Sequence, residues 1–365
     1  MKKLIVFFLC SFLSFEIFAQ SRINANYNVA YRNAQESFEG KNYGKALKYA
    51  EDAVLYKKQN VDKEIKRLES SLSAREVKAV GDRISAVLKI LNEREEYDCI
   101  DIVNYYVGLK GSSYFHYSIK ELMNYIREQE FFPEAEILIG EIYKLEGEYE
   151  YAENYFKKAL DHAEVLDIPD EKYAILYTMA DLSRLSGDYA KMEQRLLNIT
   201  GKVPLQRRNT MLKSMTSTIT RNRNDSLEKF FQMYRMDDYY CLNAYCLLSD
   251  YYASVNENEK ALGFSALAVI TGFSKMDEII SKRDLDYEYT NLTDFLVTVQ
   301  NYSDLVDWGS ENNIWKSFNN LCNLSSKVGC NNFSRELLKI LAKNSPSEYW
   351  QKAAVLKLDS LDGVN

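Results

Sequence analysis

The sequence predicts an all-α protein built from stacked helical hairpins. Three observations predict this class. Apolar residues recur at helical spacing, and no alternating strand-like runs bounded by turns stand out. The 365 residues include only 4 Pro and 14 Gly, so helix breakers are few. A short pattern that spans a turn and a helix also recurs along the chain, which is typical of repeats that bury a continuous core between neighbours.

Residues 1–19 are expected to be a signal peptide. The chain starts with the basic sequence MKK, continues with the apolar run LIVFFLCSFLSF (4–15), and has a plausible cleavage point after Ala19. The apolar run is too short for a comfortable membrane span. We therefore expect export to a bacterial periplasm or beyond, with an uncleaved N-terminal anchor as the alternative.

The clearest hairpin surrounds Gly147. The stretch GEYEYAENYFKKAL (147–160) places small and large apolar residues on one helical face and charged residues on the other. A second amphipathic run precedes it over 133–145, and Gly147 suits the left-handed conformation that ends many helices. Two antiparallel helices are therefore expected here, with Gly140 opposite Ala152 at their closest approach. The apolar face of the second helix is expected to be Ala152, Phe156 and Ala159.

Similar windows occur elsewhere, at uneven spacing. Good matches are 41–54 and 187–200, 256–269 is looser, and 95–108 and 331–344 are weak. The last window, aligned on Phe333, puts Glu336 at the small-residue position. Extended helices or degenerate hairpins are expected to fill the gaps, over 61–92 and 112–129. The alternative is an irregular helical domain with chance similarity.

These windows resemble the tetratricopeptide repeat, a helix-turn-helix unit of about 34 residues. The resemblance implies an α-solenoid that forms a right-handed superhelix and binds a partner segment on its concave face. The match is best over 136–160, where the residues in the family's positions are Ile139, Gly140, Tyr143, Gly147, Tyr149, Ala152, Phe156 and Ala159.

The repeat pattern suggests the domain organisation that follows the signal peptide. We expect N-terminal helical repeats over 20–130, the two best repeats over 131–200, a basic helical linker or degenerate repeat over 201–235, and C-terminal degenerate repeats with a cap over 236–365. The apolar run ALGFSALAVITGF (261–273) is too short to span a membrane and is expected to be a buried repeat helix.

The resemblance also implies which residues line the concave face, because the family uses fixed positions on each first helix. Packing against a neighbouring helix is the alternative at every one of them. The residues are Tyr31, Gln35 and Phe38; Ile137, Glu141 and Lys144; Tyr177, Asp181 and Arg184; and Cys246, Asp250 and Ala253.

The formal net charge of −7 gives no support to nucleic-acid binding. One segment, 201–224, has no acidic residue. Its cations accompany an apolar helical stripe, so it could contact an anionic surface, lipid or protein; the alternative is a solvated face beside acidic neighbours. The cations are Lys202, Arg207, Arg208, Lys213, Arg221 and Arg223, and the stripe is Leu205, Met211 or Leu212, Met215 and Ile219.

No enzymatic motif is found. The two histidines, His116 and His162, lack metal-ligand or triad spacing, and no phosphate-binding glycine loop, GxSxG or HExxH occurs. We expect no catalytic site, metal or cofactor, and the cysteines after Cys10 are expected to be small core residues. The predicted function is a non-enzymatic protein-binding scaffold in the bacterial cell envelope. The alternative is a helical component of a transport system that captures a small molecule or glycan.

Overall fold

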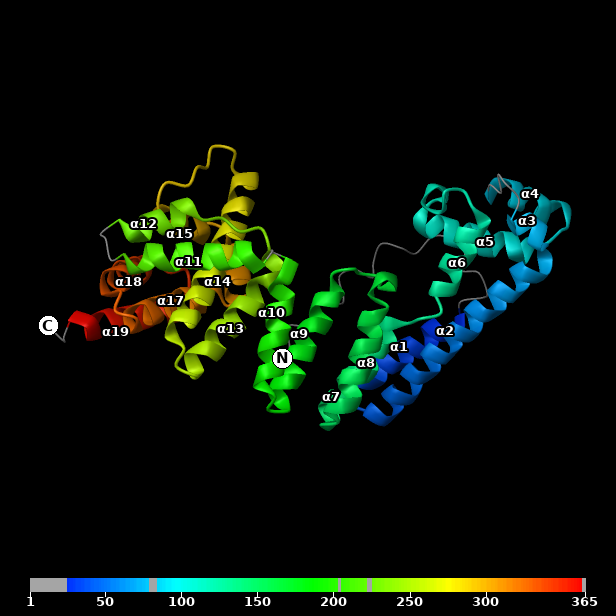
Figure 1. Ribbon diagram of the computed structural model, residues 1–365, viewed down its shortest axis with the longest axis horizontal. Coiled ribbons are helices and arrows are strands. Elements are labelled where there is room, and N and C mark those ends of the chain that lie inside the picture. The colour runs from blue at the N-terminus through cyan, green and yellow to red at the C-terminus, as the bar shows by residue number, and fades with distance from the viewer. Residues whose placement is uncertain (1–24, 79–83, 203–204, 222–224, 363–365) are drawn as a thin grey trace. The chain divides into compact units, whose positions relative to one another are not determined.

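The computed structural model describes residues 25–78, 84–202, 205–221 and 225–362. These residues are mostly helical and contain no β-strand, so the all-α class is confirmed (Figure 1). The proposed signal peptide, 1–19, lies outside the described residues. The chain divides into two compact units, Met1–Ile175 (unit 1) and Leu176–Asn365 (unit 2).

A single type of turn recurs in both units. Among the described residues, six turns place one residue in the left-handed region, and the amide that follows donates to a carbonyl five residues earlier, as Glu148 does to Tyr143 at 2.9 Å. This pattern of hydrogen bonds caps a helix C-terminus, and a new helix begins two residues after the left-handed residue. The left-handed residues are Lys41, Glu95, Gly147, Gly187, Asn256 and Gly329.

Five of these residues are the first residues of the windows found in the sequence. The sixth window requires a correction. Gly329 is the left-handed residue (φ 86°) and α18 (Asn331–Asn344) begins at Asn331, two residues earlier than the aromatic alignment implied. Ser334, which is fully buried, therefore takes the small-residue position, and Glu336 is on the surface. The physical reason is that the turn needs a residue that tolerates positive φ, and Gly329 does so at no steric cost.

In unit 1, two hairpins stack directly although they are far apart in the sequence. The first is α1 (Ala25–Glu39) with α2 (Tyr43–Ser71), and the second is α7 (Pro133–Glu146) with α8 (Tyr149–Asp161). The start of α2 packs against α7. This contact buries Ala34, Ala46, Ala50, Leu138, Ile139 and Ile142 in one cluster.

The residues between these hairpins pack on the second half of α2 (Figure 1). They form α3 (Ala74–Lys78), α4 (Ile84–Glu93), α5 (Tyr97–Lys110), the short η1 (Ser112–Phe115) and α6 (Ile119–Glu128). Apolar residues along α2, such as Val61, Ile65 and Leu68, complete their core. Because α2 is long, its first half packs within the hairpins and its second half packs against this inserted group of helices. Unit 1 ends with η2 (Ala163–Val165) and the first residues of α9.

Unit 2 is organised around α14 (Asn258–Arg283), in which every residue from Ala261 to Ser274 is buried. This burial explains the apolar run 261–273 as a core helix, as predicted. Among the described residues, no helix is both long and apolar enough to cross a membrane. Apart from two inserted pairs, six other helices of the described chain belong to unit 2 or begin at its boundary. In chain order they are α9 (Glu171–Leu185), α10 (Tyr189–Ile199), α13 (Leu242–Ser254), α17 (Ile314–Lys327), α18 and α19 (Glu348–Asp362).

Two further pairs of helices are inserted in unit 2. They are α11 (Leu205–Thr220) with α12 (Ser226–Met233), and α15 (Leu292–Gln300) with α16 (Ser303–Glu311); short η3 (Thr200–Lys202) and η4 (Tyr239–Cys241) connect the chain. The apolar stripe of α11 faces inward, because Met215 and Ile219 are fully buried in the core and α11 packs on α14. Met215 and Ile219 are therefore not available for contact with an anionic surface.

Candidate functional site

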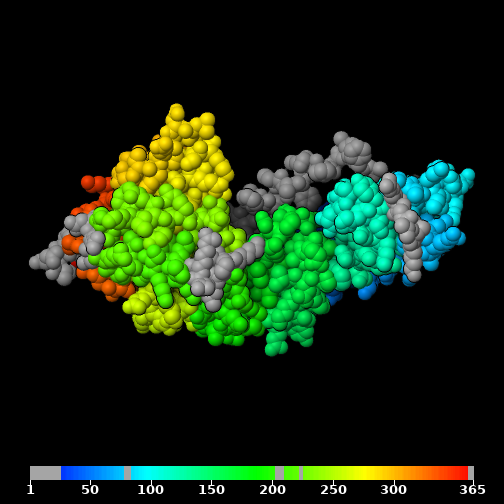
Figure 2. Space-filling model, turned by 45° about the horizontal axis from the view of Figure 1, so that its top comes forward, coloured from blue at the N-terminus to red at the C-terminus, as the bar shows by residue number. Residues whose placement is uncertain are grey.

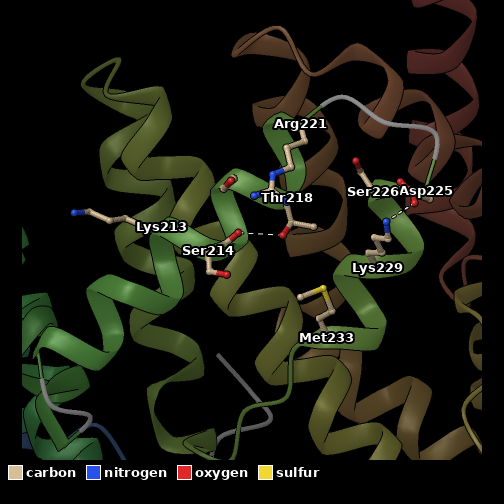
Figure 3. Close-up of a pocket in the computed structure, with 9 residues that line it drawn as sticks. Lys213, Ser214, Thr218, Arg221, Asp225, Ser226, Lys229 and Met233 are labelled. Atoms are coloured by element: carbon tan, nitrogen blue, oxygen red, sulfur yellow. Dashed lines mark hydrogen bonds and ion pairs between the residues drawn. The ribbon is translucent and has the colours of Figure 1, made fainter.

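A pocket of about 390 Å³ lies between α11 and α12 (Figure 3). Both helices contribute to the surface of unit 2 in the view of Figure 2. The lining combines cations and hydroxyl groups with a single carboxylate. Its residues are Lys213, Ser214, Ser217 and Thr218 from α11, Arg221 directly after α11, Asp225 directly before α12, and Ser226, Lys229 and Met233 from α12.

Helical periodicity explains why these side chains line one pocket. Lys213 and Ser217 are four residues apart, so they follow one side of α11. Arg221, four residues later, continues this side into the turn after α11, where its amide donates to the Ser217 carbonyl at 3.1 Å. Asp225, Lys229 and Met233 have the same spacing at α12. The opposite sides of the two helices are anchored in the core, and this anchoring turns the polar sides outward. The buried anchors are Met215, Ile219, Leu227, Phe230 and Phe231.

The charges of the lining do not cancel. Asp225 forms an ion pair of 2.5 Å with Lys229. Lys213 and Arg221 are exposed and have no ion-pair partner among the described residues. In Figure 3 the Lys213 amine points away from the other lining residues, whereas Arg221 lies beside Thr218 at the end of the pocket nearest Asp225. The lining therefore carries an excess of positive charge, which favours an anion.

Hydroxyl groups are held in place along α11. The Tyr234 hydroxyl lies 2.8 Å from Ser214 Oγ and 2.9 Å from Thr218 Oγ1, and the Thr218 hydroxyl also donates to the Ser214 carbonyl at 3.0 Å. Tyr234 is itself buried. This network fixes the backbone and side chains beside Ser217, so the pocket has a preorganised polar wall.

The sequence identified part of this pocket. Lys213 and Arg221 belong to the basic segment, but the α12 residues were not expected, because only tertiary packing brings them opposite α11. The spacing of Asp225, Lys229 and Met233 was the available signal. The side chains of Lys202, Arg207 and Arg208, and all of Arg223, lie outside the described residues.

Two predicted concave-face tyrosines have structural contacts. The Tyr31 hydroxyl donates to the Glu134 carbonyl at 3.4 Å, and its ring centroid lies 4.9 Å from that of Phe132. The Tyr177 hydroxyl donates to the Tyr240 carbonyl at 2.5 Å and accepts from the Ala244 amide at 3.1 Å. Both tyrosines therefore join helices, which is the alternative that the sequence left open.

The charged candidates form local pairs on their own helices. Lys144 lies 2.8 Å from Glu141 on α7, and Arg184 lies 2.7 Å from Asp181 on α9. On α1, the partly buried Gln35 occupies the position that corresponds to Glu141 on α7 and Asp181 on α9. All five keep solvent-accessible atoms, so they are available for contact with a partner.

Asp250 is bound by residues of the helix α17. Its carboxylate accepts from Lys316 Nζ at 2.6 Å and from Asn320 Nδ2 at 3.0 Å, both on α17. Because the turn at Gly329 fixes where α17 ends, it also identifies the residues of α17 that correspond to the concave-face candidates on the other first helices. These residues were not expected from the sequence. They are Asn319, Asn323 and Ser326, and all are partly exposed.

Within the described part of the chain, no group of three or more His, Cys, Asp and Glu side chains could hold a metal ion. Of the five described cysteines, Cys99, Cys241, Cys322 and Cys330 are buried, and Cys246 is partly buried. Cys246 Sγ lies 3.2 Å from the Ser317 hydroxyl.

No family model matches the chain. The chain is similar to an uncharacterized protein of Treponema pallidum (strain Nichols), with 27% identity over 329 residues that span 89% of this chain and 87% of the relative. The similarity therefore extends over both units and is not confined to the windows with the clearest repeat pattern.

Proposed function

We propose that this protein is a non-enzymatic, exported scaffold of the tetratricopeptide-repeat kind, and that it binds a segment of another protein. The observation that carries the proposal is the small residue found seven positions before the left-handed residue in five of the six hairpins. In each case it is buried on the first helix, where the second helix must approach closely. These residues are Ala34, Gly140, Ala180, Ser249 and Cys322.

The order of helix contacts supports the same proposal. In unit 1, the second helix of one hairpin, α2, packs on the first helix of the next, α7. In unit 2, α10 packs on α13, and α14 packs on α17. Repetition of this contact is the arrangement that generates a solenoid, so we propose that each unit is part of a right-handed superhelix with insertions.

The proposed binding surface is the exposed side of the first helices. It offers carboxylates and cations in pairs, Glu141 with Lys144 and Asp181 with Arg184. Such pairs contribute little to stability, about 0–1 kcal/mol each, so they can exchange partners at small cost. Capture of a small ligand for a transport system is the second candidate function, and the pocket between α11 and α12 is the observation that favours it.

The test compares two charge-reversed proteins in affinity purification from envelope extract of the native host. The test variant is Lys144→Glu with Arg184→Glu, on first helices. The control is Lys157→Glu with Lys339→Glu, on the second helices α8 and α18, where each lysine also belongs to a local ion pair. Both variants change the net charge equally.

We expect the test variant to lose proteins with acidic binding segments that the control and the parent protein retain. If both variants captured the same proteins as the parent, the exposed side of the first helices would not be the working surface.

A further inference from the structure

We propose that the pocket between α11 and α12 is a binding site for a phosphate monoester group. Three features of this pocket carry the proposal: an excess of two positive charges, a guanidinium beside hydroxyl groups that has no ion-pair partner in the described part of the chain, and a volume larger than a phosphate alone requires. The site is independent of the proposed protein-binding surface.

The charge of the lining matches a dianion. Three cationic side chains, Lys213, Arg221 and Lys229, accompany one carboxylate, Asp225. Since Asp225 is paired with Lys229, the lining cations without an ion-pair partner among the described residues are Arg221 and Lys213. The Lys213 amine points away from the other lining residues in Figure 3, so it must turn to reach a bound anion. A phosphate monoester carries close to two negative charges at neutral pH. A carboxylate ligand would neutralise only one.

The donor geometry favours a tetrahedral oxyanion. A guanidinium binds phosphate through two parallel N–H donors. Arg221 follows Ser217 by four residues, about one helical turn, and lies beside Thr218 in Figure 3. The Tyr234 hydroxyl holds Thr218 and Ser214 in place beside it. Lys229, across the pocket on α12, can turn from Asp225 towards a bound anion.

The remaining volume indicates that the phosphate belongs to a larger molecule. A pocket of about 390 Å³ lies in the size range of small-molecule sites. Met233, with 64% of its surface exposed, is an apolar contact at the end of the pocket away from Arg221. The phosphate monoester could be part of a soluble metabolite or of a lipid headgroup, and the experiments below distinguish these sources.

The first experiment is calorimetric titration of the full mature chain with inorganic phosphate and with glycerol 3-phosphate, in chloride buffer. Arg221→Gln should weaken binding at least about ten-fold, because it removes a charge-assisted pair of hydrogen bonds. Ser217→Ala should weaken it less. Asp225→Asn should strengthen binding, because it removes the only carboxylate of the lining and frees Lys229. Lys352→Gln, an exposed lysine of α19 paired with Glu348, is the matched control and should have no effect.

The second experiment identifies the source of the phosphate. Phosphatidylcholine vesicles containing phosphatidic acid carry a phosphate monoester headgroup, and vesicles with phosphatidylglycerol at equal surface charge carry a phosphodiester. A lipid headgroup is supported if the parent protein binds the phosphatidic acid vesicles, the Arg221→Gln variant does not, and glycerol 3-phosphate does not bind. Binding of glycerol 3-phosphate supports a soluble ligand.

Equal binding to both kinds of vesicle, unaffected by Arg221→Gln, would overturn the proposal, since it would indicate a diffuse electrostatic contact of the whole basic segment. Absence of binding in both experiments would overturn it as well. An unchanged circular dichroism spectrum of each variant shows that a loss of binding does not reflect unfolding.

Discussion

The ring of Phe156 occupies the space that a side chain at Gly140 would need. A β-carbon built on Gly140 would lie 2.9 Å from Cζ of Phe156, which is fully buried. This contact joins α7 and α8 at Gly140, and Ala152, which was expected opposite Gly140, is buried on the same face of α8 as Phe156. Phe156 is one helical turn after Ala152 on α8. Its ring leans towards the N-terminus of α8, as long side chains on a helix do, and there it contacts Gly140 of α7.

Gly140→Ala should therefore destabilise unit 1. The added methyl overpacks the contact with Phe156, and the expected loss is about 1–3 kcal/mol in the free energy of unfolding. Gly44→Ala, on α2, is the matched control, because its β-carbon would meet no atom within 4 Å. The control should be neutral or stabilising, since alanine favours helix more than glycine does. Urea unfolding followed by circular dichroism measures both, and equal shifts would contradict the packing described here.

Ala152→Leu tests the same hairpin from the other helix. Ala152 is fully buried on α8, so a larger side chain should cost about 1–3 kcal/mol of unfolding free energy. Glu150→Ala, on the exposed side of α8, should change stability by no more than about 0.5 kcal/mol. The two variants are compared by thermal and urea unfolding; similar destabilisation by both would show that this hairpin is packed differently.

The stability of unit 1 should fall as the pH rises towards neutrality. Burial raises the pKa of Glu136 to about 7, with Lys158 opposing part of the effect, and its Oε2 atom has no hydrogen-bond partner among the described residues. The folded protein therefore holds a proton that the unfolded chain releases near its ordinary pKa. The free energy of unfolding should decrease between about pH 4.5 and pH 7, by up to about 3 kcal/mol.

Glu136→Gln should remove the part of this pH dependence that Glu136 contributes, because glutamine does not titrate. Unfolding free energies are measured at several pH values from 4.5 to 8, with Glu150→Gln as the exposed control. A parent-like slope in Glu136→Gln would mean that another group is responsible.

Tyr106→Phe should destabilise the group of helices that packs on the second half of α2. The Tyr106 hydroxyl donates to Glu64 Oε2 at 2.7 Å, and both residues are buried. Without this donor, a buried carboxylate loses its partner, at a cost of about 1–3 kcal/mol. Tyr117→Phe, at a residue that is 51% exposed, is the control and should have little effect. Chemical denaturation of both variants decides the matter: if they are equally stable, the buried hydrogen bond contributes nothing.

The sequence by itself determined the helical class and the local geometry of the hairpins. Five windows located residues that adopt the left-handed conformation, such as Gly147 and Asn256, because this turn depends on nearby residues only. The sixth window starts two residues too late, because alignment on Phe333 passes over Gly329, which adopts the left-handed conformation. The small residues Gly140 and Ala180 were also recognised, because their spacing from the turn is fixed by the helix repeat.

Tertiary structure alone decided where the inserted helices go. The contact of α2 with α7 joins residues separated by the whole of α3–α6, and no local pattern indicates that the second half of α2 supports this group. From the sequence, the apolar stripe of α11 could contact a membrane surface or a protein core. In the structure Met215 and Ile219 are buried in the core of unit 2. The same burial places the polar side of α11 opposite Asp225 and Lys229, so the pocket exists because of packing on the opposite sides of α11 and α12.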